Sequence, residues 1–102
     1  MNTLNQTEKL YELHEEYQNK LLVINAFYST ELSNSVSESE KEMTYASFRR
    51  FYEIMGEFTD RLGKESHINK KIEIAIERDN YLNAIMNNYN IEYKVEEDEI
   101  KK

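Results

Sequence analysis

Few residues in this chain could do chemistry, and their spacing completes no catalytic or metal-binding motif. The sequence has two histidines and no cysteine. His14, followed by Glu15 and Glu16, matches the start of the helical zinc-protease motif, which needs a second histidine four residues after the first to bind one metal ion. Position 18 is Gln18, and the second histidine, His67, lies far along the chain, where we expect it at the surface. The sequence therefore predicts no metal site.

Serines gather in one polar stretch, residues 33–37. A serine nucleophile needs a base positioned against it, and no glycine-framed turn surrounds these serines. Ser37, three residues before Glu40, instead matches a capping box at the start of a helix, and so does Ser35, three residues before Glu38. The sequence also has no glycine-rich phosphate-binding loop. We therefore expect no enzyme activity and no cofactor.

The net charge disfavours partners that carry phosphate. The chain has 102 residues, with 20 acidic and 13 basic side chains and a formal net charge of −7. An acidic surface repels nucleic-acid backbones and anionic membranes, so we expect direct binding to neither. The first ten residues lack a signal-peptide pattern, and the absence of cysteine fits a reducing cytoplasm. Abundant Asn, Lys, Ile and Tyr suit AT-rich codons, which favours a bacterial, phage or other mobile-element origin.

Three segments carry apolar residues at steps of three and four, the period of an amphipathic helix. Across residues 3–32 the stripe is Leu10, Leu13, Tyr17, Leu21, Ile24, Tyr28 and Leu32. Across residues 38–62 it is Phe48, Phe51, Met55, Phe58 and Leu62. From about residue 66 it is Ile68, Ile72, Ala75, Asp79, Leu82, Met86, Tyr89 and Tyr93. The apolar alternation in residues 91–95 fits a helix or an extended segment equally well.

These elements predict an all-α protein, an antiparallel (up-down-up) three-helix bundle with long helices. Short polar connections place consecutive helices side by side and antiparallel. We expect one domain over residues 1–95, followed by a mobile, charged tail of mostly acidic residues at 96–102. The alternative is a two-helix hairpin that completes its core by dimerising.

Asp79 is the one carboxylate on the third stripe, between Ala75 and Leu82. Because a buried carboxylate without a partner is costly, we expect it to be paired. The first and third helices run parallel in such a bundle, and His14 and Asp79 lie at similar depths along them. We predict that these two buried polar residues meet directly or through a water. The alternative places Asp79 at the rim, bonded to a tyrosine hydroxyl or to Arg50.

Large apolar residues that fall off the stripes are the candidate protein-binding residues. They are Tyr11, Leu22, Ile74 and Tyr81. Acidic residues along one side of the first helix would form the rim of this surface, namely Glu8, Glu12 and Glu15. Exposed aromatic and aliphatic side chains on rigid helices are typical anchors of protein interfaces.

The sequence therefore predicts a non-catalytic protein–protein interaction module that acts as an adaptor, inhibitor or regulator of another protein. One alternative is an acidic mimic of nucleic acid, which would inhibit a DNA- or RNA-binding protein. A second alternative is a structural helical homodimer.

Overall fold

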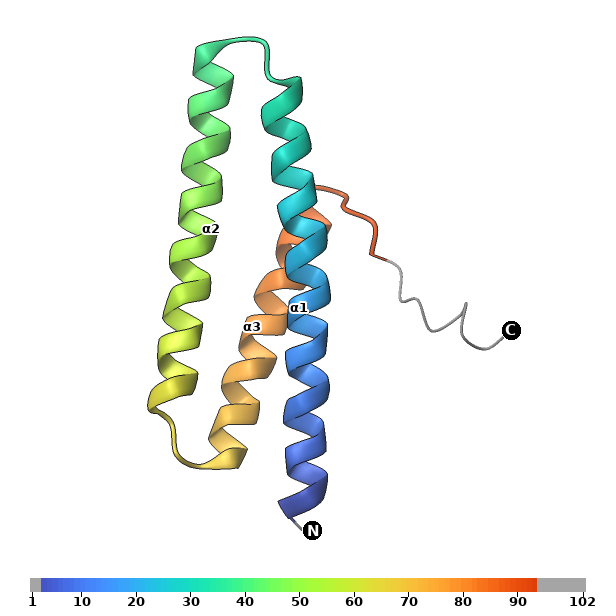
Figure 1. The fold of residues 1–102 in the computed structure, drawn as a ribbon, viewed down its shortest axis with the longest axis vertical. Helices are drawn as coiled ribbons and strands as arrows, with labels where there is room; N and C mark the ends of the chain where they lie inside the picture. The colour runs from blue at the N-terminus through green and yellow to red at the C-terminus, as the bar shows by residue number, and fades with distance from the viewer. Residues whose placement is uncertain (1–2, 94–102) are drawn as a thin grey trace, which may run out of the picture.

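The computed structural model describes residues 3–93, with side chains from residue 5 onward, and these residues form three α-helices (Figure 1). The helices are α1 Thr3–Asn34, α2 Glu38–Lys64 and α3 Ile68–Asn88. No β-strand occurs between residues 3 and 93, so the all-α prediction is confirmed. The predicted tail, 96–102, and the predicted domain boundary at residue 95 lie outside the described residues.

Short connections join the helices at opposite ends of α2. In Figure 1 the chain rises through α1, descends through α2 and rises again through α3. Between α2 and α1, the Tyr52 hydroxyl donates a hydrogen bond to Asn25 Oδ1 at 2.7 Å. Near the starts of α1 and α3, Gln6 donates to Asn69. α3 packs more extensively against α1 than against α2.

The predicted capping box begins α2. Ser37 Oγ accepts a hydrogen bond from the Glu40 backbone N–H at 3.1 Å. The Glu40 carboxylate reaches back and accepts from the Val36 N–H at 3.4 Å. Ser37 thus satisfies one N–H that the first turn of α2 would otherwise leave unpaired, and Glu40 satisfies the N–H of the residue before the cap.

The core lies where the three helices face one another. Ile24 from α1, Phe51 from α2 and Leu82 from α3 are each at most 1 % exposed. The other large apolar residues buried in the same cluster are Tyr28, Met55, Phe58, Ile74 and Met86. Burying one such side chain contributes about 1.5–3 kcal/mol, so this shared core stabilises helices that would be marginal alone.

The inner face of α3 differs by one position from the predicted stripe. Arg78, and not Asp79, lies in the interior between Ala75 and Leu82, with 4 % of its surface exposed. Ile74 is also buried, at 8 % exposed, so its predicted place in an exposed protein-binding surface is wrong. A step of three then four and a step of four then three both keep to one side of a helix. Spacing alone therefore cannot choose between positions 78 and 79.

α3 ends at Asn88, below the level at which α1 connects to α2 (Figure 1). Asn90 has a φ of 54°, in the left-handed region that asparagine tolerates better than most residues. The chain then reverses, and the Ile91 N–H donates to the Met86 carbonyl at 2.8 Å. Ile91 and Tyr93 pack half-buried against the core in a non-helical segment. The upper parts of α1 and α2 are consequently left without a third helix beside them.

Candidate functional site

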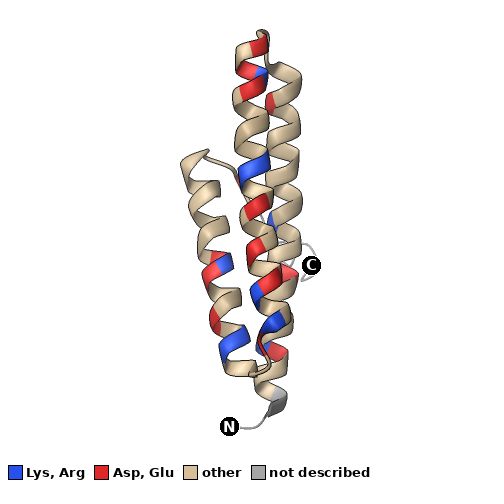
Figure 2. Cartoon of the chain, turned by 90° about the vertical axis from the view of Figure 1, so that its left-hand side faces the viewer, with Lys and Arg blue, Asp and Glu red and all other residues tan. Residues whose placement is uncertain are grey.

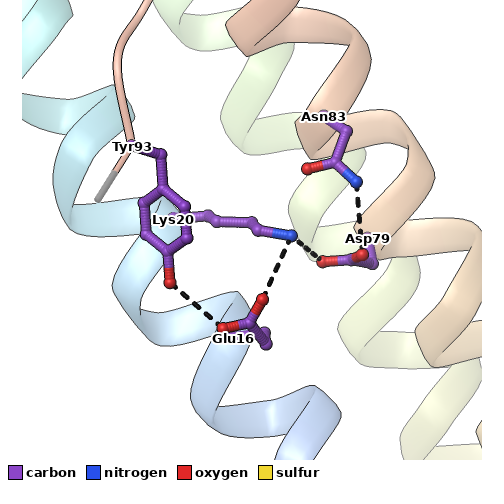
Figure 3. A network of polar contacts seen from close by, with 5 residues as sticks. All are labelled: Glu16, Lys20, Asp79, Asn83 and Tyr93. Carbon is purple, nitrogen blue, oxygen red and sulfur yellow. Dashed lines mark hydrogen bonds and ion pairs between the residues drawn. The ribbon is translucent and has the colours of Figure 1, made fainter. Parts of the chain in front are cut away.

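A network of polar side chains joins α1, α3 and the segment after α3 (Figure 3). Lys20 Nζ donates to Asp79 Oδ1 at 2.6 Å and lies 3.4 Å from Glu16 Oε1. Asn83 Nδ2 donates to the other oxygen of Asp79 at 3.3 Å. The Tyr93 hydroxyl donates to Glu16 Oε2 at 3.1 Å. Each member of the network is thus held by at least one other member.

Burial makes Lys20 the centre of this network. Its side chain is 7 % exposed, whereas those of Asp79 and Glu16 are 22 % and 41 % exposed. A buried ammonium needs charged partners because it has lost its water. The Tyr93 ring centroid lies 5.7 Å from Lys20 Nζ and adds a cation–π contact. Burial, and then the hydrogen bond to Glu16, raises the pKa of Tyr93. The network therefore ties the reversed segment down onto α1.

The predicted pairing of Asp79 with His14 is wrong. The alternative placed Asp79 at the rim, which agrees with a side chain that is 22 % exposed, but the predicted partners there, Arg50 or a tyrosine hydroxyl, are not the ones observed. Asp79 bonds Lys20 and Asn83. His14 is exposed, with its ring centroid 6.0 Å from that of Tyr17, so the prediction that it is buried is also wrong. Sequence reasoning missed Lys20 because a long basic side chain one residue from the apolar stripe usually extends to solvent.

A second buried cation, Arg78, lies in the interior close to this network. Its guanidinium carbon lies 3.8 Å from the centroid of the Tyr17 ring on α1. Its Nε–H is buried and has no hydrogen-bond partner. Burial lowers the pKa of Arg78, which nevertheless stays protonated at neutral pH because the ordinary value for arginine is so high. Arg78 therefore contributes stacking and packing, but its hydrogen bonding is incomplete.

The charged groups of this network are engaged with one another. The network pairs its lysine and carboxylates with one another, and it contains no serine, cysteine or histidine. Within residues 3–93, no three metal-ligating side chains are grouped so as to hold an ion. None of the three helices in this range has a stretch long and apolar enough to cross a bilayer. The network holds α1 against α3 and against the segment after α3.

The predicted protein-binding residues fall in two different places. Tyr11 and Leu22 are 64 % and 68 % exposed and, being 11 residues apart, project from α1 within about 20° of each other. Glu8, Glu12 and Glu15 are exposed on the same helix. The Tyr81 ring, in contrast, packs against Phe51 and Phe58 at 6.4 Å. Burial raises its pKa, and its prediction as an exposed anchor is wrong, as it is for Ile74.

A groove that the sequence did not predict opens where α3 ends. We call it the hairpin groove, and its lining residues are Phe27, Tyr28 and Glu31 on α1, Met43, Thr44 and Ser47 on α2, and Tyr89 after α3. Tyr28 is 3 % exposed and stacks on Phe48 of α2 at 4.9 Å. Tyr89 closes the end of the groove nearest α3, with its ring 4.8 Å from that of Phe27.

The hairpin groove combines an apolar interior with an acidic surrounding. Met43 is 70 % exposed and Tyr89 43 % exposed, and both line the same hollow as the buried Tyr28. Residues 27–47 include four glutamates and one lysine. Figure 2 shows acidic residues gathered where α1 and α2 meet, with a basic residue among them. Exposed apolar side chains in a hollow, rimmed by charge, are typical of an interaction site.

Comparisons with protein-family models, with curated proteins and with solved structures found no match for this chain. The interpretation of the hairpin groove therefore depends on its own geometry and chemistry.

Proposed function

We propose that this chain is an up-down-up antiparallel three-helix bundle that works as a non-catalytic protein–protein interaction module, and that the hairpin groove is its contact surface. The observation that supports this proposal is that the hairpin groove, which lies beyond the end of α3, exposes two large apolar side chains, Met43 and Tyr89. Covering a large apolar side chain contributes about 1.5–3 kcal/mol. A partner that covers both residues gains a useful fraction of the free energy that a micromolar complex needs.

The groove supports this function better than the outer face of α1 does. Tyr11 and Leu22 lie about 16 Å apart along the helix. Hot-spot residues bind best in pockets from which the partner excludes water. The hairpin groove provides such a pocket, because side chains from two helices and Tyr89 surround one hollow. We therefore assign the predicted adaptor, inhibitor or regulator role to the groove, acting in the cytoplasm of a bacterium or a mobile element's host.

Matched surface variants test this proposal. Met43→Lys places a charge in the groove, and Leu22→Lys places one on the outer face of α1, at a residue of nearly equal exposure, 70 % against 68 %. Each tagged variant is used to capture proteins from a lysate of the native host, and mass spectrometry quantifies what co-purifies. We expect a partner that the wild type and Leu22→Lys retain and Met43→Lys loses. Loss with Leu22→Lys alone would assign binding to the outer face instead.

The wild-type protein and its captured partner also distinguish the two alternative functions, the nucleic-acid mimic and the structural homodimer. The affinity of an acidic nucleic-acid mimic falls steeply with ionic strength, whereas binding through an apolar groove changes much less. A structural homodimer would show in sedimentation as a mass that rises with protein concentration. We expect a monomer at both of two concentrations and a partner that stays bound when salt is raised several-fold.

A further inference from the structure

Building on the proposed function, we infer that the occupant of the hairpin groove is a basic amphipathic helix from another protein. The shape and the charge of the groove lead separately to this partner, and each can be tested without the other.

The shape argues for a helix. α3 ends at Asn88, while α1 and α2 continue beyond it (Figure 1). The groove is lined by residues of α1 and α2 and by Tyr89, which directly follows α3. Its walls are made by residues one turn apart on each helix, Phe27 with Glu31 and Met43 with Ser47. The groove therefore runs along the two helices, as α3 does lower in the bundle. An amphipathic helix lays its apolar side chains into such a groove at positions i, i+3 and i+4.

The charge argues that this helix is basic. Glu31 lines the groove, and Glu40 lies in the first turn of α2, toward its far end. The C-terminus of α3 borders the near end and carries the partial negative charge of its carbonyl groups, with no basic residue in the last turn. Lys41 is the one basic residue between positions 27 and 47. Lysine or arginine beside the apolar stripe of the partner would therefore find opposite charge at both ends of the groove.

The same charges disfavour the other occupants. A second copy docked groove to groove would bring Glu31 and Glu40 close to their own counterparts, and like charges across an interface are costly. The last residues of this chain are also a poor match, because positions 96–99 are all acidic. A basic helix from a different protein is the occupant whose charge complements the groove.

The test uses synthetic helices and the full chain labelled with ¹⁵N. The first peptide is an 18-residue amphipathic helix of leucine, alanine and lysine. The second has every lysine replaced by glutamate, and the third has the first composition scrambled so that no apolar face forms. We expect the lysine peptide to shift the amide signals of Phe27, Glu31, Met43, Ser47 and Tyr89. We expect the glutamate peptide to bind at least about tenfold more weakly, because of like-charge repulsion.

Variants in matched pairs locate the contact. An apolar contact of the groove is removed by Met43→Ala, and its control on the outer face of α1 is Leu22→Ala. A charged contact of the groove is removed by Glu31→Gln, and its control on the outer face is Glu15→Gln. We expect each groove variant to weaken the lysine peptide about three- to tenfold, the effect of losing roughly one contact. We expect the two outer-face variants to bind as the wild type does.

Several results would overturn the inference. Equal binding of the lysine and glutamate peptides would refute the basic partner, and equal binding of the scrambled peptide would refute the helix. Absence of any shift in the groove would refute both. Dimerisation that Met43→Ala abolishes would identify a second copy as the occupant. Groove signals that move when residues 94–102 are deleted would identify the chain's own end. The proposed function fails separately, if capture of the native partner is unaffected by Met43→Lys.

Discussion

Replacing Lys20 with methionine should destabilise the protein more than any comparable change of a surface lysine. The substitution keeps an apolar chain of similar length but removes the ammonium that lies 2.6 Å from Asp79 and 3.4 Å from Glu16. Removing one member of a fully buried pair costs about 3–5 kcal/mol. The carboxylates left behind are 22 % and 41 % exposed and regain part of their hydration. We therefore expect a loss of about 2 kcal/mol of unfolding free energy, or roughly 10 °C in melting temperature.

Urea titration followed by circular dichroism at pH 7 measures this loss. Lys64→Met is the matched control, because Lys64 forms an ion pair of 3.1 Å with Asp60 whose side chains are 77 % and 68 % exposed. Such a surface pair contributes about 0–1 kcal/mol. The double variant Lys20→Met with Asp79→Leu should recover most of the loss, because it removes both members of the ion pair and leaves neither charge unpartnered by the other. The reasoning is refuted if Lys20→Met is as stable as Lys64→Met, or if Asp79→Leu adds a further loss of its own.

Three further predictions concern the interior. Arg78→Met should unfold at the same or a higher urea concentration than the wild type, because it removes a buried Nε–H that has no partner; a clear loss would show that stacking on Tyr17 outweighs that cost. The pKa values of Tyr28, Tyr81 and Tyr93 are all raised, first by burial, so the folded state holds these protons more tightly than the unfolded state does. Stability should therefore not depend on these tyrosines below about pH 10, the ordinary tyrosine pKa, and should fall above it. Urea midpoints at pH 8 and pH 11, read together with tyrosinate absorbance, test the direction of this change. A urea midpoint that is higher at pH 11 than at pH 8 would contradict it. Leu82→Ala removes a side chain that is 0 % exposed and should lower the free energy of unfolding by about 2–5 kcal/mol. Leu22→Ala should change it by less than about 0.5 kcal/mol. Similar urea midpoints for these two variants would contradict the assigned core.

The helices were predictable because strong local signals agree with one another. Long apolar stripes, the absence of proline and the capping box at Ser37 all favour the same segments. The predicted ends of the first two helices, residues 32 and 62, each fall two positions before the observed ends at Asn34 and Lys64. Local hydrogen bonds and periodicity set these boundaries, and both are visible in the order of the residues.

The polar interior was not predictable from periodicity. Arg78 and Asp79 both satisfy the helical spacing, and Lys20 is adjacent to the predicted stripe position Leu21. Their burial depends on which long side chains find partners across the α1–α3 interface, and the order of residues along one helix does not contain that information. His14 was predicted to be buried because its angular position is close to the stripe, but the structure leaves it exposed.

The hairpin groove could not be predicted because it is produced by the place where α3 ends. Tyr89 and Tyr93 keep the helical spacing, so the stripe suggested a helix that continued beyond residue 88. Asn87, Asn88 and Asn90 were the available signal, since asparagine weakens helices and tolerates the left-handed conformation. Tyr93 then bonds Glu16 below the groove. That long-range contact, together with the bond from the Ile91 N–H to the Met86 carbonyl, holds residues 91–93 away from the groove.

A methyl spectrum of the methionines, recorded with the chain bound to its native partner, shows whether that partner occupies the hairpin groove. The sequence has four methionines. Met43 is 70 % exposed in the groove, whereas Met55 and Met86 are 3 % and 6 % exposed in the core. We predict intermolecular nuclear Overhauser contacts from the Met43 methyl group to aliphatic protons of a partner helix, with the Met55 and Met86 signals little changed. A bound complex in which Met43 keeps its free-state signal, with contacts at Tyr11 or Leu22 instead, would contradict the assignment of the groove.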